Sequence, residues 1–410
     1  MPRRLARASA LLLLGACASE DAPLLVTSPV TADAEMAAPR MFGSNPSPRQ
    51  GVVTGGDIDD TLNTSAFFEY ADRAITETNL PQFAFGKPLK LRLLGADGAP
   101  APGMRVSLRH PGQPKPFYSG YAGVDGLVTV FPALHGAQES RPIELRAFAE
   151  GQDLPFAKVL KVTDNRHEVT LPFASTWAPD FLDLVLVLDT TGSMADELKW
   201  LTTELRTIVR KARQVAPDTQ IRFGLVVYRD TADAYVVRNY GFAENQAQMR
   251  RWLRAQEADG GGDYPEAAAA AMGVAADLPW RRGRGERLIF HVADAPPHSA
   301  EIADYIQAVR KAGSKDVQIF SLGASGVAAE SEYLMRQASV VTGGRYLFLT
   351  DDSGIGDSHA EPTIPCYRVT LLNDLVTRVL QSELSGVRVE ADADAIVREV
   401  GTYRRGVCVE

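Results

Sequence analysis

Hydrophobic residues are spaced in three different ways along the chain, and each spacing covers its own stretch. Residues 18–85 are rich in Ala, Pro, Ser, Thr and Asp and have few apolar clusters. Residues 86–173 alternate apolar and polar positions in short runs, whereas residues 174–386 alternate continuous apolar runs with stretches of helical period. These patterns predict a flexible tether, a unit of short strands and a unit of strands alternating with helices, followed by a C-terminal extension at 387–410.

The stretch 86–173 has the two-residue period of half-buried strands. Leu89, Leu91 and Leu93 alternate with basic residues, and similar runs recur between turns rich in Gly, Pro and Asp. Short alternating strands at regular spacing predict an all-β antiparallel sandwich. The loops at 97–103 and 123–127 resemble those of Ig-like or transthyretin-like modules of bacterial surface proteins, which implies a spacer or a secondary binding module.

The stretch 174–386 has the pattern of a parallel sheet covered on both faces. Its apolar runs predict buried strands at 183–188, 221–228, 287–293, 317–322 and 345–349. Its helical periods predict helices at 194–213, 265–276, 302–311, 330–340 and 371–384. Alternation of this kind predicts a doubly wound, Rossmann-like α/β domain, in which ligands bind at the carboxyl ends of the strands.

The first 17 residues have the features of an export signal. Three arginines precede an apolar run at 10–14 that is too short to cross a bilayer, since a spanning helix takes about 20 residues. The run ends in Leu14-Gly15-Ala16-Cys17, which resembles a bacterial lipobox. That resemblance implies lipidation of Cys17 and a membrane anchor in the cell envelope, and Ala18 after it favours the outer membrane. The alternative is an ordinary signal peptide with a chance cysteine.

Charge and cysteine content narrow the classes of partner. The 410 residues include 43 basic and 51 acidic side chains, a net charge of −8, which argues against a nucleic-acid partner. With Cys17 assigned, Cys366 and Cys408 are the cysteines that remain of the three in the chain. An exported protein permits a disulfide between them, which would contribute about 3–4 kcal/mol, and two unpaired thiols are the alternative.

The end of the first predicted strand of the α/β unit carries a candidate metal site. A loop leaving a strand can direct the side chains of Asp189, Thr191 and Ser193 to one point, and such hard oxygen ligands suit Mg²⁺. The motif resembles the metal-ion-dependent adhesion site of von Willebrand factor A (VWA) domains. The alternative is a simple helix N-cap formed by Thr191 or Ser193.

Two later loops extend the resemblance over residues 180–385. Gly260-Gly261-Gly262-Asp263-Tyr264-Pro265-Glu266 stands where the VWA family has its third metal-site loop, and is similar to the A domain of hemicentin. Asp294 follows the third buried strand, where the family has its last aspartate. The resemblance implies that Asp189, Thr191 and Ser193 bind the cation directly, and Asp263 and Asp294 directly or through water. The cation implied is Mg²⁺, with Mn²⁺ or Ca²⁺ as alternatives.

The third loop departs from the family pattern in having Asp263 where most members have Thr. Three carboxylates around one divalent cation leave a local charge of about −1, so the cation should be held well. Its attraction for an acidic side chain of a partner should be reduced. Metal binding is therefore the stronger expectation, and capture of an acidic ligand the weaker one.

A second acidic motif lies within the predicted tether. Asp57-Ile58-Asp59-Asp60-Thr61 matches the DxDxT signature of haloacid-dehalogenase-type phosphotransferases, whose first Asp is a nucleophile at the end of a buried strand. The preceding residues 51–56 are rich in turn formers and do not read as an apolar strand. We therefore interpret the motif as an acidic cap before a short amphipathic segment at 66–70.

These features together predict a membrane-anchored, extracytoplasmic binding or adhesion protein and not an enzyme. Its partner would be a protein or extracellular-matrix ligand bound through the metal site. The alternative is a periplasmic scaffold or assembly factor that uses the same domain to form a complex. Metal-assisted hydrolysis ranks third, because the sequence places no general base beside the site.

Overall fold

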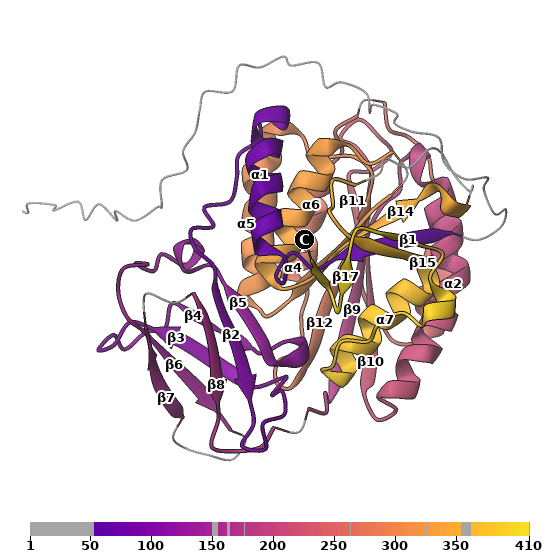
Figure 1. The fold of residues 1–410 in the computed structure, drawn as a ribbon. Coiled ribbons are helices and arrows are strands. Elements are labelled where there is room, and N and C mark those ends of the chain that lie inside the picture. Colours follow the sequence, from indigo (N-terminus) through magenta and orange to yellow (C-terminus); the bar gives the residue numbers. More distant parts are fainter. Residues whose placement is uncertain are drawn as a thin grey trace, which may run out of the picture.

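The computed structural model describes residues 53–149, 155–161, 165–175, 177–262, 264–324, 326–353 and 362–409. Cys17, the predicted signal peptide, the tether as far as residue 52 and Asp263 lie outside the described residues. The described chain forms an α/β unit and a small β unit (Figure 1). None of the helices in these ranges combines the length and the apolar character needed to cross a bilayer.

A nine-stranded sheet is the centre of the α/β unit, and five consecutive strands of it, the second to the sixth, are parallel. In spatial order the strands are β11 (Val237–Ala243), β10 (Gln220–Tyr228), β9 (Phe181–Asp189), β12 (Gly285–Ala293), β13 (Gln318–Gly323), β14 (Tyr346–Thr350), β1 (Thr54–Ile58), β15 (Tyr367–Leu371) and β16 (Arg398–Val400). Strands β10, β9, β12, β13 and β14 run parallel, and the remaining pairings are antiparallel. The predicted parallel core is confirmed, and the sheet as a whole is mixed.

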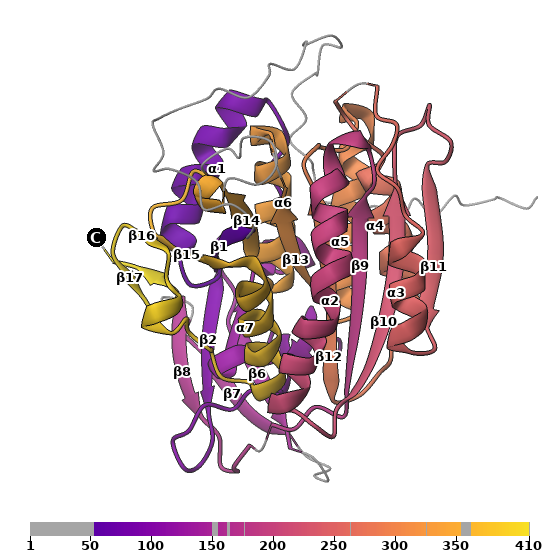
Figure 2. The same cartoon turned by 90° about the vertical axis from the view of Figure 1, so that its right-hand side faces the viewer.

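Seven helices cover the two faces of this sheet in the described residues. One face carries α1 (Thr64–Thr78), α4 (Ala268–Asp277), α5 (Ile302–Ser314) and α6 (Ala329–Thr342), and the other carries α2 (Ala195–Val215), α3 (Gln246–Arg254) and α7 (Leu372–Ser385). Figure 2 shows α2, α3 and α7 on the near side of the sheet. Every residue of β9 is buried, so its apolar run belongs to a strand that is covered on both faces of the sheet. The α/β prediction is confirmed.

The predicted tether is wrong from residue 54 onward, because this segment is part of the α/β unit. β1 is fully buried between β14 and β15, and α1 packs on α6. The sequence TGGDI has no apolar run. Its two glycines stand where neighbouring atoms leave no room for a side chain. A Cβ on Gly55 would lie 2.6 Å from the backbone oxygen of Phe348, and one on Gly56 would lie 2.7 Å from the Phe348 ring. The strand fits at this position because its glycines let the neighbouring backbone approach closely. A hydropathy pattern gives no sign of such an approach.

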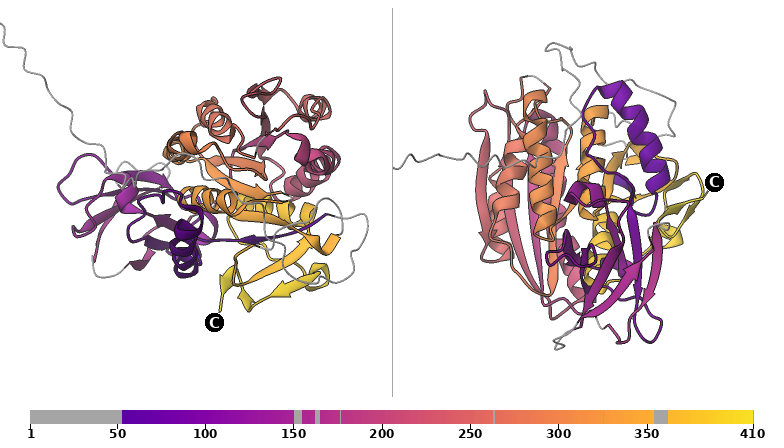
Figure 3. Two further views of the ribbon diagram at one scale, coloured as in Figure 1. Left: turned by 90° about the horizontal axis from the view of Figure 1, so that it is seen from above. Right: turned by 90° about the vertical axis from the view of Figure 1, so that its left-hand side faces the viewer.

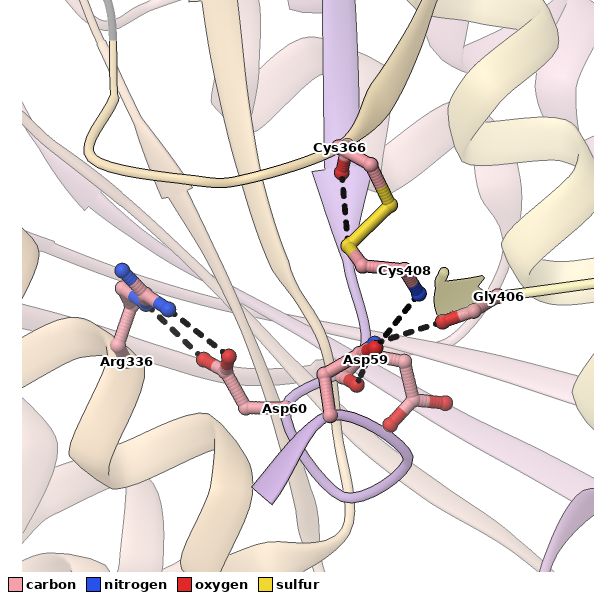
Figure 4. Close-up of a disulfide and its surroundings, with 7 residues drawn as sticks. Asp59, Asp60, Arg336, Cys366, Gly406 and Cys408 are labelled. Atoms are coloured by element: carbon pink, nitrogen blue, oxygen red, sulfur yellow. Dashed lines mark hydrogen bonds and ion pairs between the residues drawn. A yellow bond between two sulfur atoms is a disulfide. The ribbon is translucent and has the colours of Figure 1, made fainter. Parts of the chain in front are cut away.

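The acidic motif at the end of β1 forms buried ion pairs, so its interpretation as a simple cap is wrong. Asp60 binds Arg336 of α6 through both carboxylate oxygens, at 2.9 and 3.0 Å (Figure 4). Asp59 pairs with Arg388, and Asp57 lies 3.5 Å from the guanidinium of Arg345. These partners lie 276 to 329 residues further along the chain. The motif therefore joins the N-terminal segment to the C-terminal half.

The C-terminal extension is also built into the α/β unit. β16 pairs with β15 as the last strand of the sheet, and β17 (Tyr403–Arg404) and β18 (Val407–Cys408) form a hairpin. The predicted disulfide between Cys366 and Cys408 is confirmed (Figure 4). Asn63 lies beside it, donating to the Gly406 carbonyl at 2.7 Å and accepting from the Cys408 N–H at 2.8 Å. The disulfide thus closes the tail over the start of α1.

The small β unit consists of two sheets that share one apolar core. Strands β5 (Leu127–Val130), β2 (Leu89–Leu94) and β8 (Arg166–Thr170) form one sheet, and β4 (Tyr118–Tyr121), β3 (Arg105–Arg109), β6 (Ile143–Phe148) and β7 (Phe156–Leu160) form the other. β2 pairs with β8 in parallel, so the expectation of wholly antiparallel pairing is wrong for that pair. The resemblance to Ig-like or transthyretin-like modules stays a prediction.

The two units are in contact at the C-terminal end of α7. The Asp125 N–H donates to the Gly386 carbonyl at 2.8 Å, and the Trp177 indole donates to the Glu383 carbonyl at 3.1 Å. Phe131 of the small β unit belongs to the same apolar cluster as Phe67 and Phe85. Figure 3 shows the small β unit at one side of the α/β unit.

Candidate metal site

The candidate site lies where β9 and β12 end side by side in the middle of the sheet. β10 flanks β9 on one side and β12 flanks it on the other, so the strand order changes direction between β9 and β12. Loops leaving such a switch point diverge and leave a crevice at the carboxyl ends. Asp189 is the last residue of β9, and Asp294 follows the last residue of β12. The structure therefore brings these two predicted residues to one place.

The loop after β9 holds Asp189 in one orientation. The backbone N–H and the hydroxyl of Thr191 both donate to Oδ1 of Asp189, at 2.9 and 2.7 Å. The hydroxyl of Ser193 lies 3.4 Å from that of Thr191 and interacts with the carboxylate of Asp294. Asp189 is fully buried and Ser193 is exposed, so the oxygens run from the sheet edge toward solvent. The expected grouping of Asp189, Thr191, Ser193 and Asp294 is present.

The third loop closes over this group from the side. The N–H of Gly192 donates to the Gly260 carbonyl at 3.2 Å. Gly261 has a φ of +77°, and a Cβ there would lie 3.2 Å from the Cβ of Thr191 and 3.1 Å from Oε1 of Glu266. The Gly-rich run thus lets backbone pass between Thr191 and Glu266. Asp263, the predicted ligand in this loop, lies outside the described residues.

Glu266, the last residue of the Gly-rich motif, is a buried acid that the family resemblance did not assign as a ligand. Its side chain is 3 % exposed, and its backbone N–H donates to the Pro296 carbonyl at 2.9 Å. Glu197, in the first turn of α2, is a second buried acid near the site. The residue types gave no signal for Glu197, because acids are common in the first turn of any helix.

Three of these carboxylates have an oxygen without a partner among the described residues. The atoms are Oδ2 of Asp189, Oδ1 of Asp294 and Oε2 of Glu266, all buried. No lysine or arginine of the described residues forms an ion pair with any of the three, although such unpaired buried oxygens are costly. An arrangement of carboxylates and hydroxyls with free oxygens fits a hard divalent cation.

Crowding of acids raises the pKa values of this group. Burial and then the charge of Asp294 raise the pKa of Asp189 to about 7. Burial and then the charges of Asp189, Asp230, Asp233 and Asp294 raise the pKa of Glu266 to about 9. The pKa of Asp294 is also raised, chiefly by burial. The raised pKa values show that the three carboxylates have no positive charge nearby. A bound cation would supply that charge.

Two further residues at this edge have local partners. Arg229 is buried, and it donates to Asp259 at 3.2 Å and to the Glu257 carbonyl at 2.8 Å. His298 binds Asp230 at 2.5 Å between its Nε2 and the carboxylate. Both side chains stabilise the loops around Asp189, Asp294 and Glu266, and neither is a candidate metal ligand.

The described part of the chain holds no group of three or more His, Cys, Asp and Glu side chains arranged as metal ligands. The predicted ligand set includes two hydroxyls, those of Thr191 and Ser193, beside the carboxylates of Asp189 and Asp294. The unpartnered oxygens of those two carboxylates are the observation that favours a cation at this site.

Comparison with known proteins gives a family match for the region that contains the site. Residues 183–353 match the family model described as the von Willebrand factor A domain. A 145-residue match of 26 % identity relates the chain to the alpha-protein kinase vwkA of Dictyostelium discoideum, covering 35 % of this chain and 23 % of that protein. A 188-residue match of 26 % identity relates it to the ariadne-like RING finger protein R811 of Acanthamoeba polyphaga mimivirus, covering 41 % and 18 %.

The chain thus spans about a fifth of the length of these two relatives. Among solved structures, the conserved hypothetical protein BatB from Bacteroides thetaiotaomicron matches with a TM-score of 0.35 and 14 % sequence identity. That match covers 49 % of this chain and 96 % of BatB.

Proposed function

We propose that this chain, which carries a von Willebrand factor A domain at residues 183–353, holds a divalent cation at the carboxyl edge of its sheet and binds a protein partner there. The observation that carries the proposal is the set of buried, unpartnered oxygens of Asp189, Asp294 and Glu266 beside the hydroxyls of Thr191 and Ser193. VWA domains commonly mediate protein–protein interaction, which supports a binding function.

Mg²⁺ is the cation that this donor set suits best, with Mn²⁺ and Ca²⁺ as alternatives. Asp189, Thr191 and Ser193 would hold it, and Asp294 and Asp263 would bind directly or through water. Glu266 adds a further acid to the ones inferred from the sequence. When bound, the cation would supply positive charge to this cluster of acids. The added acid reinforces the expectation that a neutral or weakly acidic partner surface is favoured over a strongly acidic one.

Replacing Asp189 should remove cation binding. We expect the full chain to bind Mg²⁺ saturably in isothermal titration calorimetry, and Asp189→Ala to show no measurable heat, because its carboxylate is the buried end of the ligand set. Thermal unfolding of both proteins in EDTA shows that the variant is folded. Asp304→Ala, an exposed acid on α5, is the matched control and should bind as the wild type does. Equal Mg²⁺ binding by Asp189→Ala would contradict the site.

At the level of the cell, we propose a membrane-anchored, extracytoplasmic adhesion protein, tethered through lipidated Cys17 in the outer membrane. The small β unit would act as an Ig-like or transthyretin-like spacer beside the A domain. The alternative is a periplasmic scaffold that assembles a complex through the same domain. The names of the relatives include a kinase and a RING finger protein, but the matched segments are about a fifth of those proteins, so we propose binding and not catalysis.

Capture of a partner should depend on the cation. We expect purified full chain to retain a specific protein or matrix component from a cell-envelope extract with Mg²⁺, and to release it with EDTA. Asp189→Ala should retain none, and Asp304→Ala should behave as the wild type. Protease accessibility on intact cells then separates a surface adhesin, which is cleaved, from a periplasmic scaffold, which is protected. Retention that is equal in Mg²⁺ and in EDTA would overturn the proposal.

A further inference from the structure

A groove lies between the small β unit and the amino-terminal end of the large sheet. It has a volume of about 490 Å³, within the range of about 300–1,000 Å³ that small-molecule sites occupy. Its walls come from β3 and β4 of the small β unit, from the loop 278–283 before β12 and from the turn 314–316 before β13. The parallel strands begin here, whereas the candidate metal site is where they end. The groove is therefore separate from that site.

The charge of this groove is opposite to that of the protein as a whole. Its lining includes five cationic side chains and a single carboxylate, that of Asp316, whereas the chain carries a net charge of −8. The cationic residues are Arg105, Arg281, Arg282, Arg287 and Lys315. Walls of one charge sign in a cleft focus the electrostatic field and concentrate counter-ions of opposite sign. The groove therefore has the charge needed to attract an anion.

Existing carboxylates compensate only part of this positive charge. Asp183 is shared by Arg281 and Arg222, each at 2.7 Å, so one negative charge meets two positive ones. Asp277 lies 2.6 Å from Lys311 and 3.6 Å from Lys315.

The groove's remaining arginines make no close ion pair with a described carboxylate, although Asp316 interacts over a longer distance with Arg287 and Arg105, and Glu286 with Arg287. Arg105, Arg282 and Arg287 form no ion pair within 4.0 Å with the acids of the described residues. Arg105 instead lies over the ring of Phe148, at 5.0 Å.

Arg287 is the groove residue whose side chain is fixed in place by surrounding backbone, and it is only 4 % exposed. It donates to the carbonyls of Arg281, Gly285 and Gly283, at 2.5, 3.0 and 2.7 Å. A guanidinium has five N–H donors, and these three bonds use three of them. Two N–H donors of Arg287 therefore have no acceptor among the described residues. A buried, preorganised guanidinium with donors to spare binds planar or tetrahedral oxyanions well.

Asp316 is the acid within the groove, and it stands in an unusual backbone conformation. Its φ is +57°, a left-handed value that Asp and Asn adopt more readily than other non-glycine residues. Its carboxylate interacts with the charges of Arg287 and Arg105. It therefore competes with any other anion for the same two guanidinium groups.

We propose that this groove is a binding site for a phosphate-bearing anion, with Arg287 as the buried contact and Arg105 and Arg282 as the outer contacts. The volume admits a small phosphorylated molecule or the headgroup of an anionic phospholipid, and both present the same oxyanion chemistry. The negative charge of Asp316 cancels part of the positive charge of Arg287 and Arg105 and so weakens anion binding. The site should therefore favour ligands that carry more than one negative charge.

Calorimetry of the full chain with inorganic pyrophosphate tests the site. We expect saturable binding by the wild type, and a loss of about tenfold or more in affinity for Arg105→Gln combined with Arg282→Gln, since charge-assisted contacts are removed. Both side chains are exposed, so folding should be kept. Asp316→Asn keeps the left-handed turn and removes the competing charge, so it should bind about threefold to tenfold more tightly. Arg73→Gln, an exposed arginine on α1, should bind as the wild type does.

Co-sedimentation with vesicles distinguishes the two sources of phosphate. Binding to phosphatidylglycerol vesicles but not phosphatidylcholine vesicles, lost in the Arg105 and Arg282 double variant, supports a lipid headgroup. Pyrophosphate binding with the same loss, and no vesicle binding, supports a soluble phosphorylated ligand. Binding to neither probe, or binding that the double variant and Asp316→Asn leave unchanged, would overturn the proposal.

Discussion

A chain that begins at residue 63 is expected not to fold, although the sequence pattern marks the removed part as a tether. The deletion removes β1, which is fully buried between β14 and β15, and leaves two strands of the sheet without their shared partner. It also removes Asp59 and Asp60, which pair with Arg388 and Arg336. Loss of one partner of a buried pair costs about 3–5 kcal/mol, and domains have only about 5–15 kcal/mol of stability.

The matched control is a chain that begins at residue 53, which keeps every described contact. We expect it to unfold cooperatively at the same urea concentration as the full chain, with the same near-ultraviolet circular dichroism. The chain from residue 63 should show no cooperative transition. Cooperative unfolding of that shorter chain at a midpoint close to the control would show that β1 is dispensable.

Replacement of Arg336 by Met is expected to destabilise the folded state by about 3–5 kcal/mol, the largest effect of a single substitution predicted here. Arg336 is fully buried on α6, with Asp60 at 2.9 Å, Glu332 at 3.2 Å and the ring of Tyr70 at 3.8 Å. Burial alone would lower its pKa, but Asp60 raises the pKa of Arg336 above its usual value. Without the guanidinium, two carboxylates lie buried with no cation.

Urea unfolding of wild type and variant measures this effect. Arg284→Met is the matched control, because Arg284 and Asp180 form an exposed pair at 3.0 Å whose loss should cost less than about 1 kcal/mol. Adding Asp60→Asn to Arg336→Met should restore part of the stability, since one uncompensated charge disappears. A cost below about 1 kcal/mol for Arg336→Met would show that the acids are neutral or hydrated in the folded protein.

Local patterns in the sequence were enough to predict the parallel core and part of the candidate site at its carboxyl edge. The continuous apolar run of β9 predicts a strand buried on both faces, and the motif after it places Asp189, Thr191 and Ser193 at that strand's end. Asp294 came from the resemblance to von Willebrand factor A domains, and it lies beside Asp189 in the structure because the parallel strands β9 and β12 end at one edge. The strand β9 and the motif after it need only neighbouring residues and the geometry of one strand and one loop.

Only the tertiary structure decided the placement of β1, whose residues TGGDI resemble a turn-rich linker. The strand is stabilised by neighbours about 290 to 320 positions away, and the glycines that weaken its local signal are required by the close backbone and ring of Phe348. The same holds for the partners of Asp59 and Asp60, and for the groove that joins Arg105 to Arg287. Such contacts depend on the free energy of long-range pairing, which no local period encodes, so they appear only once the chain is folded.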